Sequence, residues 1–290
     1  MATLDDSRAG AAPWLLCAPA LLLFLALLLV PLILTFVLSF HVFSDIAGVQ
    51  RGWTLTHYLE VLSDPYYGEI FLRTAGLAFA VTLLSIVLGV PETLVLARMR
   101  RPWQSVCLLI VLGPLLISVV VRTLGWQILL GNNGVLNHAL QALHITDEPI
   151  RLVFTMTGTI IALTHVLVPF MVMSVWATLQ KLDPQVEWAG RSLGASPLRV
   201  FRRVILPQIM PGVLSGSIIV FALSASAFAT PALIGGRRLK VVATAAYDEF
   251  LGTLNWPLGA SIAVLLLIAN VAIVMGCSRL AERRFKHIFD

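Results

Sequence analysis

Six long apolar runs, separated by short polar segments, set the pattern of this chain. They cover residues 14–40, 75–97, 106–130, 155–179, 211–233 and 258–277. Each run is long enough to cross the hydrocarbon core of a bilayer as a helix, which takes about 20 residues. Helices are required because an unpaired backbone amide or carbonyl in hydrocarbon costs several kcal/mol. The pattern predicts an all-α integral membrane protein with six transmembrane helices, the first of them a retained anchor rather than a signal peptide.

Composition and motifs exclude several classes of protein. Of the 290 residues, 58% are hydrophobic and only 12% are charged, whereas about a quarter of the residues of a soluble domain are charged. The chain carries no GxxxxGK[ST] phosphate loop, no HExxH pair and no cofactor fingerprint, so we expect no catalysis and no bound cofactor. Cys17, Cys107 and Cys277 are far apart and predict neither a metal site nor a redox pair. Nothing indicates a nucleic-acid partner.

The distribution of basic residues predicts the orientation. Thirteen of the twenty Lys and Arg residues lie on one side of the predicted spans and six on the other, while Arg122 lies inside a span. Basic residues are enriched in cytoplasmic loops. Both termini and the segment 182–207 are therefore expected in the cytoplasm.

The segment 182–207, LDPQVEWAGRSLGASPLRVFRRVILP, is too basic and too interrupted to lie in the bilayer. Asp183 and Pro184 form a helix start and Gly194 a helix stop, while Ser196 and Pro197 start a second helix. We expect two short amphipathic helices joined by a turn, with Pro207 marking the entry to the fifth span. Such a pair can fill a groove in a soluble partner. It can equally rest on anionic lipid headgroups, and these features alone leave both alternatives open.

This segment resembles the cytoplasmic EAA loop of permease subunits of binding-protein-dependent ABC importers. In that loop a glycine is followed, after nine intervening residues, by hydrophobic residues and a Leu-Pro pair. Here Gly194 is followed in the same way by Val204 to Pro207. The Glu-Ala-Ala triplet departs from the pattern, since Glu187 lies one position early. RTLGWQILLGNNGVLN, DEPIRLVFT, ATPALIGG and NWPLGASIAV extend the resemblance over about 73–276 and are similar to the spermidine and putrescine class.

The resemblance implies the type I ABC importer permease fold in a bacterial inner membrane. It implies an anchor helix and first extracytoplasmic loop at 1–72, a permease domain at 73–280 and a basic cytoplasmic tail at 281–290. Expected partners are an ATPase dimer that carries ATP and Mg²⁺, a second and different permease subunit, an extracytoplasmic solute-binding protein and membrane lipid. The ATPase-coupling residues would be Glu187, Ala189, Gly194, Ala195, Ser196, Pro197, Arg202, Leu206 and Pro207.

Polar residues in and near the spans are candidates for the substrate pathway: Arg122, Trp126, Ser224, Ser226 and Thr230. Arg122 can instead be a structural anchor, and small hydroxylated residues also occur where helices pack. Asn132 and Asn133 are candidates for binding-protein contact, or form an ordinary turn.

Two further intramembrane residues are expected to be structural. Glu92 should pair with Arg98 or Arg101, and His165 should be a packing histidine rather than a metal ligand.

The predicted function, as the resemblance implies, is the pathway-forming subunit of an ATP-driven importer for a small solute, with a polyamine as the expected class. The alternative is an ion- or proton-coupled secondary transporter. That class should show inverted repeats or a relay of intramembrane carboxylates, and neither is apparent in the sequence.

Overall fold

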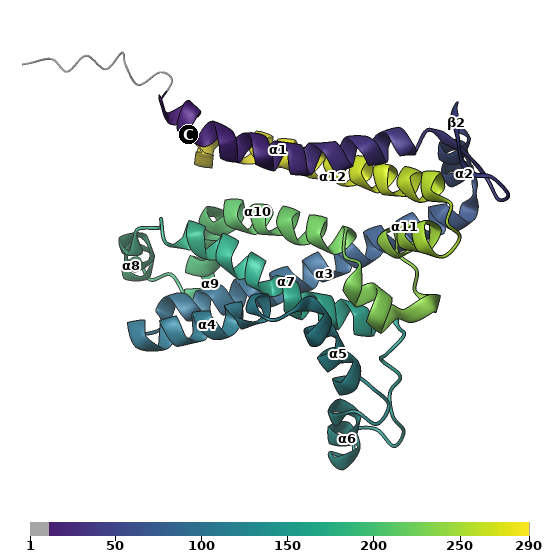
Figure 1. Ribbon diagram of the computed structural model, residues 1–290. Helices are drawn as coiled ribbons and strands as arrows, with labels where there is room; N and C mark the ends of the chain where they lie inside the picture. The colour runs from purple at the N-terminus through teal and green to yellow at the C-terminus, as the bar shows by residue number, and fades with distance from the viewer. Residues whose placement is uncertain (1–11, 290) are drawn as a thin grey trace, which may run out of the picture. The chain divides into compact units, whose positions relative to one another are not determined.

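The computed structural model describes residues 12–289, with side chains described for 16–279 except 184 and 187. The expected tail at 281–290 and residues 1–11 therefore lie outside the described side chains. Figure 1 labels the elements. The long helices are α1 (Ala12–Leu38), α3 (Pro65–Arg98), α7 (Met156–Leu179), α10 (Leu206–Ala225) and α12 (Trp256–Phe289). The shorter ones are α2 (Thr56–Ser63), α4 (Arg101–Leu116), α5 (Val119–Leu129), α6 (Val135–Ala142), α8 (Pro184–Ser192), α9 (Pro197–Val200) and α11 (Val242–Leu251).

Short irregular elements complete the chain. They are the π turns η2 (Phe201–Ile205) and η3 (Pro231–Gly235), the 3-10 turn η4 (Gly236–Arg238), and the strands β1 (His41–Ser44) and β2 (Gly48–Trp53). By contact density the described chain divides into residues 12–61 with 246–264, and residues 62–245 with 265–289. The second of these units contains both the 182–207 segment and the candidate pathway residues.

Among residues 12–289, five helices are long and apolar enough to cross a membrane, or six when the bent pair α4 and α5 counts as one span. The third predicted span, residues 106–130, is thus not one continuous helix: α4 and α5 meet at 100°. Pro114 lacks the N–H that would bond back into the preceding turn. α4 ends two residues after it, and the backbone is extended at Ile117.

The fifth span also differs from the prediction of 211–233. α10 ends at Ala225, residues 227 and 228 are not helical, and the chain turns again only at 229–235. Pro231, which has no N–H to continue a helical ladder, begins the π turn η3 after this break.

The core of the larger unit lies where α3, α7 and α10 pack side by side (Figure 1). Met171 of α7 is fully buried there, and glycines face it from both neighbouring helices. A Cβ at Gly89 of α3 would lie 2.9 Å from Met171 Cγ, and one at Gly216 of α10 would lie 2.8 Å from its Sδ. Ser174 Oγ also donates to the carbonyl of Gly212, 2.8 Å away. Small residues thus allow the helix backbones to approach closely, as is typical of membrane helix pairs.

The smaller unit contains a feature that the all-α expectation missed. β1 and β2 form an antiparallel hairpin in which His41 pairs with Trp53 and Ser44 with Gly48. Gly48 has φ +68°, a conformation that glycine adopts without steric cost. Ser261 of α12 donates to the carbonyl of Ser39, 3.1 Å away, which ties the end of α1 to the start of α12.

The packing around Met171 makes a stability prediction. Gly216→Leu should lower the thermal unfolding midpoint of the detergent-solubilised protein, because overpacking a tight core costs about 1–3 kcal/mol. The control is Gly76→Leu in α3, where a Cβ would meet no atom within 4 Å. Circular dichroism melts of both variants measure the difference, and equal midpoints would contradict the proposed tight contact.

Candidate functional site

The first helix of the 182–207 segment forms as the sequence predicts. Asp183 caps α8 by accepting from the backbone amide of Gln185 at 2.9 Å, and Pro184 occupies the first turn. At the other end Gly194 has φ +78°. The amides of Gly194 and Ala195 donate back to the carbonyls of Arg191 and Gly190 at 2.9 and 3.2 Å. This pair of bonds is a Schellman motif, which a left-handed glycine completes.

The second helix does not end where the sequence predicts. α9 begins at Pro197 behind Ser196, but it continues through the π turn η2 into α10, so that Pro197–Ala225 is one membrane-span candidate. Pro207 therefore does not interrupt the chain. The wider turn ends with the amide of Leu206 bonded to the carbonyl of Phe201. Such a π bulge lets a helix pass a position that cannot donate a backbone hydrogen bond.

One side of this segment is anchored in the bundle. Val200 and Ile205 are buried in the core cluster, and Ala195 and Leu206 pack against that cluster. A Cβ at Gly190 would lie 3.3 Å from Val200 Cγ2, so α8 lies directly against the end of α9.

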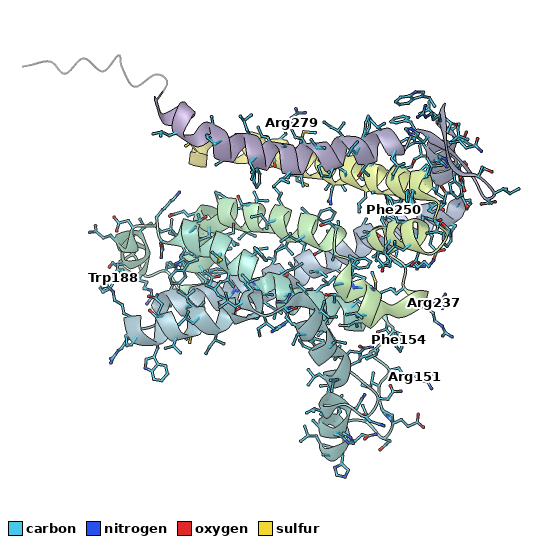
Figure 2. The ribbon with its side chains drawn as sticks, viewed as in Figure 1. Arg151, Phe154, Trp188, Arg237, Phe250 and Arg279 are labelled. Atoms are coloured by element: carbon cyan, nitrogen blue, oxygen red, sulfur yellow. The ribbon has the colours of Figure 1, made fainter. Side chains whose placement is uncertain are left out.

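The opposite side is an exposed surface, which we call the α8 surface and define by Trp188, Leu193, Leu198, Arg199 and Arg202. Trp188 is 74% exposed and Leu193 is 88% exposed. Figure 2 shows Trp188 on α8, at one end of the bundle of α3, α7 and α10. Beside it, Ser196, Leu198 and three arginines surround a hollow of about 470 Å³.

Some of the predicted coupling residues lie on the side of the segment that packs against the core, and others lie on the exposed side. Ala195 and Leu206 are half-buried, and the side chain of Glu187 is not described. The exposed members are Ala189, Gly194, Ser196, Pro197, Arg202 and Pro207. Large apolar side chains in this exposed position are typical of surfaces that another protein covers.

Arg122 lies at the break between α4 and α5, and it is only 9% exposed. Its Nη1 donates to the carbonyl of Pro114, one of the carbonyls that lose their helical partner where α4 stops. The next residue, Thr123, places its hydroxyl 3.3 Å from that of Thr230. The guanidinium thus stabilises the broken span.

The hydroxylated residues of the fifth span do not form one continuous stripe. Ser224 is buried and donates to the carbonyl of Val220 at 2.7 Å. Ser226 is exposed and donates to the carbonyl of Ala222 at 2.8 Å. Thr230 is buried on the far side of the helix break.

Asn132 and Asn133 lie on an exposed turn, and the residue that holds this turn is one that sequence reasoning missed. Asn137 is 1% exposed. Its amide nitrogen donates to the carbonyls of Gly131 and Ile150, and its oxygen accepts from the amide of Ile150 at 2.8 Å. A polar residue in an apolar helix face was the only sequence signal for this role.

Glu92 does not pair with Arg98 or Arg101 as expected. Within the described residues its carboxylate has no hydrogen-bond or ion-pair partner. α-Helix geometry explains the error, since residues three or four apart are neighbours and Arg98 is six positions away.

His165 does find a partner. The indole N–H of Trp126 donates to its Nδ1 at 3.2 Å. Among the described residues there is no group of three His, Cys, Asp or Glu side chains that could hold a metal ion.

Comparison with known proteins identifies the family. The family model described as "Binding-protein-dependent transport system inner membrane component" matches residues 12–287. The chain belongs to this family. It is the permease subunit of a binding-protein-dependent ABC importer, a multi-pass component of the bacterial inner membrane.

Among the relatives are proteins named spermidine/putrescine transport system permease protein PotB. The one from Salmonella typhimurium (strain SL1344) is 33% identical over 255 residues, which is 87% of this chain and 88% of the relative. The one from Escherichia coli (strain K12) is 33% identical over 252 residues, covering 87% and 90%. The molybdenum transport system permease protein ModB of Mycobacterium bovis is 32% identical, covering 78% and 81%.

Solved structures share the fold. A bacterial alginate ABC transporter in complex with an alginate-bound periplasmic protein contains a chain that matches with a TM-score of 0.78 and 17% identity, over 94% of this chain and 96% of that one. The MetNI methionine ABC transporter in an inward-facing conformation matches with a TM-score of 0.54 and 20% identity, over 73% and 93%. The type I ABC importer permease fold predicted from the sequence is confirmed.

The role of Asn137 is testable. Asn137→Ala should lower the free energy of opening of the 131–150 segment by about 2 kcal/mol, because the carbonyls of Gly131 and Ile150 lose their donor and the amide of Ile150 loses its acceptor. Hydrogen exchange of peptides from this segment, followed by mass spectrometry, measures the change. Asn133→Ala on the exposed turn is the control, and equal exchange in the two variants would refute the role.

Proposed function

We propose that this chain is one of two different permease subunits of a polyamine importer whose ATPase subunits dock on the α8 surface. The observation that supports the substrate class is the 33% identity to PotB permeases over 87% of the chain. ModB aligns at similar identity over less of the chain and has another solute in its name. The longer match favours the polyamines.

The α8 surface supports the docking of a soluble motor. Its apolar side chains Trp188 and Leu193 are too exposed for an isolated protein in water, and a groove in a partner would bury them. The basic side chains of the same surface, Arg199 and Arg202, would pair better with acidic residues at the edge of that groove than with apolar ones. ATP and Mg²⁺ would be held by that partner, and this chain would hydrolyse nothing.

The connection from this surface to the bundle is stiff. α9, η2 and α10 form one continuous element, and Ile209 and Val213 of α10 are buried in the core cluster. Because no flexible linker intervenes, a displacement of α8 would be transmitted to α10 and to the break at residues 227 and 228.

The remaining assignments complete the proposal. The turn with Asn132 and Asn133 would contact the extracytoplasmic binding protein, and both termini would be cytoplasmic. The half-buried Trp126 and the exposed Ser226 would face the pathway. The buried Arg122, Ser224 and Thr230, each bonded within the chain, would shape it. We retain the division into 1–72, 73–280 and 281–290 as part of this proposal.

Reconstitution tests the proposed function. The chain would be placed in proteoliposomes with the ATPase, second permease and binding protein encoded beside it, and uptake of labelled spermidine, putrescine and molybdate would be measured. We expect uptake of the polyamines that requires ATP and survives a protonophore. Uptake of molybdate alone would refute the substrate class. Uptake that needs no ATP but collapses with the proton gradient would refute the mechanism in favour of secondary transport.

Gly194 should be essential for coupling. Gly194→Val places a β-branched residue in a left-handed conformation, which costs about 1–2 kcal/mol even for an unbranched one, and should turn α8 away from the bundle. We expect membrane insertion to persist while ATP-driven uptake falls roughly tenfold, the effect of about 1.4 kcal/mol. Gly194→Asn is the control, because asparagine tolerates this conformation. Full uptake by the valine variant would show that the turn does not position α8.

A further inference from the structure

A cavity of about 730 Å³ is lined by residues of α3, α4, α5 and α7. Its wall is mainly apolar and includes Leu84, Leu88, Ile110, Val111, Ile161 and Val168. Polar groups line it at separate places: Glu92 on α3, and Thr164, His165 and Trp126 on α7 and α5. From Leu84 to Glu92 the α3 side of the cavity is roughly 12 Å long at 1.5 Å per residue.

The carboxylate of Glu92 has no partner in the described part of the chain. It lies within a membrane span and faces this cavity rather than a basic side chain. A carboxylate inside a membrane is costly, and where it persists it usually serves a substrate, an ion or a proton. A proton or a cationic ligand would compensate the charge of this carboxylate.

Thr164 gives independent evidence for a ligand. Its side chain is 98% buried, as its 2% exposure shows, yet its Oγ1 has no hydrogen-bond partner. Other buried hydroxyls of the same helix bond to their own backbone, as Thr159 does to the carbonyl of Thr155 at 2.9 Å. A buried hydroxyl without a partner is destabilising, and a ligand N–H in the cavity would satisfy it.

The charged and titratable groups around the cavity determine where a cation can lie. Arg122 has the ligand's sign of charge, but its guanidinium is bonded to the carbonyl of Pro114 and does not line the cavity. His165 is occupied as the acceptor of the Trp126 indole. Glu92 is thus the one acidic side chain of the lining, and it can neutralise one ammonium group.

We propose that this cavity is an intramembrane binding site for an alkylammonium ion. The ammonium lies at the carboxylate of Glu92, the methylene chain lies against the apolar wall, and a distal N–H donates to Thr164 Oγ1 near the indole of Trp126. This inference rests on the proposed polyamine importer and names the residues of this chain that hold the substrate during passage.

The experiment uses the complete reconstituted importer and labelled spermidine. Glu92→Gln keeps the shape of the side chain and removes its charge, so uptake should fall about tenfold or more, since charge-assisted bonds to an ammonium are strong. Glu92→Asp keeps the charge on a shorter side chain, so it should retain part of the spermidine uptake that Glu92→Gln loses. Glu69→Gln is the charge-matched control, because Glu69 pairs with Arg73 outside the cavity and its loss should leave uptake near the wild-type value.

A second variant separates ligand binding from folding. Thr164→Val removes an unpartnered hydroxyl, so a purely structural role predicts equal or greater thermal stability and unchanged uptake. The proposal predicts a raised KM for spermidine together with unimpaired stability. Thr159→Val, which removes a hydroxyl that is satisfied and does not line the cavity, is the control and should leave KM unchanged.

The outcomes distinguish the two proposals. Wild-type uptake of spermidine with equal uptake by Glu92→Gln and equal KM in Thr164→Val would overturn the cavity site and leave the importer function intact. Absence of spermidine and putrescine uptake by a wild-type complex that hydrolyses ATP would overturn the polyamine function, and the cavity site with it. If Glu92→Gln fails to assemble, the KM of Thr164→Val decides: a raised value supports the site and an unchanged value overturns it.

Discussion

The structure depends on one constraint: a backbone carbonyl or amide that leaves its helical ladder inside a membrane must find another partner within the protein. The break between α4 and α5 shows how this chain meets it. α4 ends two residues after Pro114. The guanidinium of Arg122 donates a hydrogen bond to the Pro114 carbonyl, which has no helical partner there. A buried arginine that is costly on its own becomes the group that makes a 100° bend possible. Residues on both sides of this bend, Pro114 of α4 and Trp126 of α5, line the cavity that they share with α3 and α7.

The same constraint governs the course of the chain from α8 into α10. Proline at position 207 would be expected to interrupt the chain, yet the π turn η2 carries the helix past it with the bond from the Leu206 amide to the Phe201 carbonyl. The Schellman bonds at Gly194 fix the angle of α8 on the other side of the turn. Backbone hydrogen bonds therefore close both the turn between α8 and α9 and the π turn between α9 and α10. α9, η2 and α10 thus form one continuous element.

Local rules predicted the parts of the fold that local chemistry decides. The Asp183 cap and the stop at Gly194 both follow from residues within four positions. The predictions that failed concern segments whose course depends on contacts outside the local turn. The course of residues 106–130 depends on whether Arg122 reaches Pro114, and the continuity at Pro207 depends on packing of Val200 and Ile205 in the core. The β1–β2 hairpin was hidden because a short polar connection between two apolar runs has no membrane signature.

Two intramembrane charges illustrate how structure separates support from function. Sequence alone left Arg122 as either a pathway candidate or a structural anchor, and it predicted an ion pair for Glu92. The contacts of Arg122 agree with the anchor interpretation, whereas the ion pair of Glu92 is not formed among the described residues. Arg122 is buried, and its Nη1 donates to the Pro114 carbonyl, while its Nε has no hydrogen-bond partner among the described residues. Glu92 is uncompensated and faces a cavity with apolar walls, so a positively charged ligand gains there the full interaction that water would otherwise screen. In a bilayer, where an unsatisfied charge is rarely retained without use, the uncompensated group is the better indicator of what passes through.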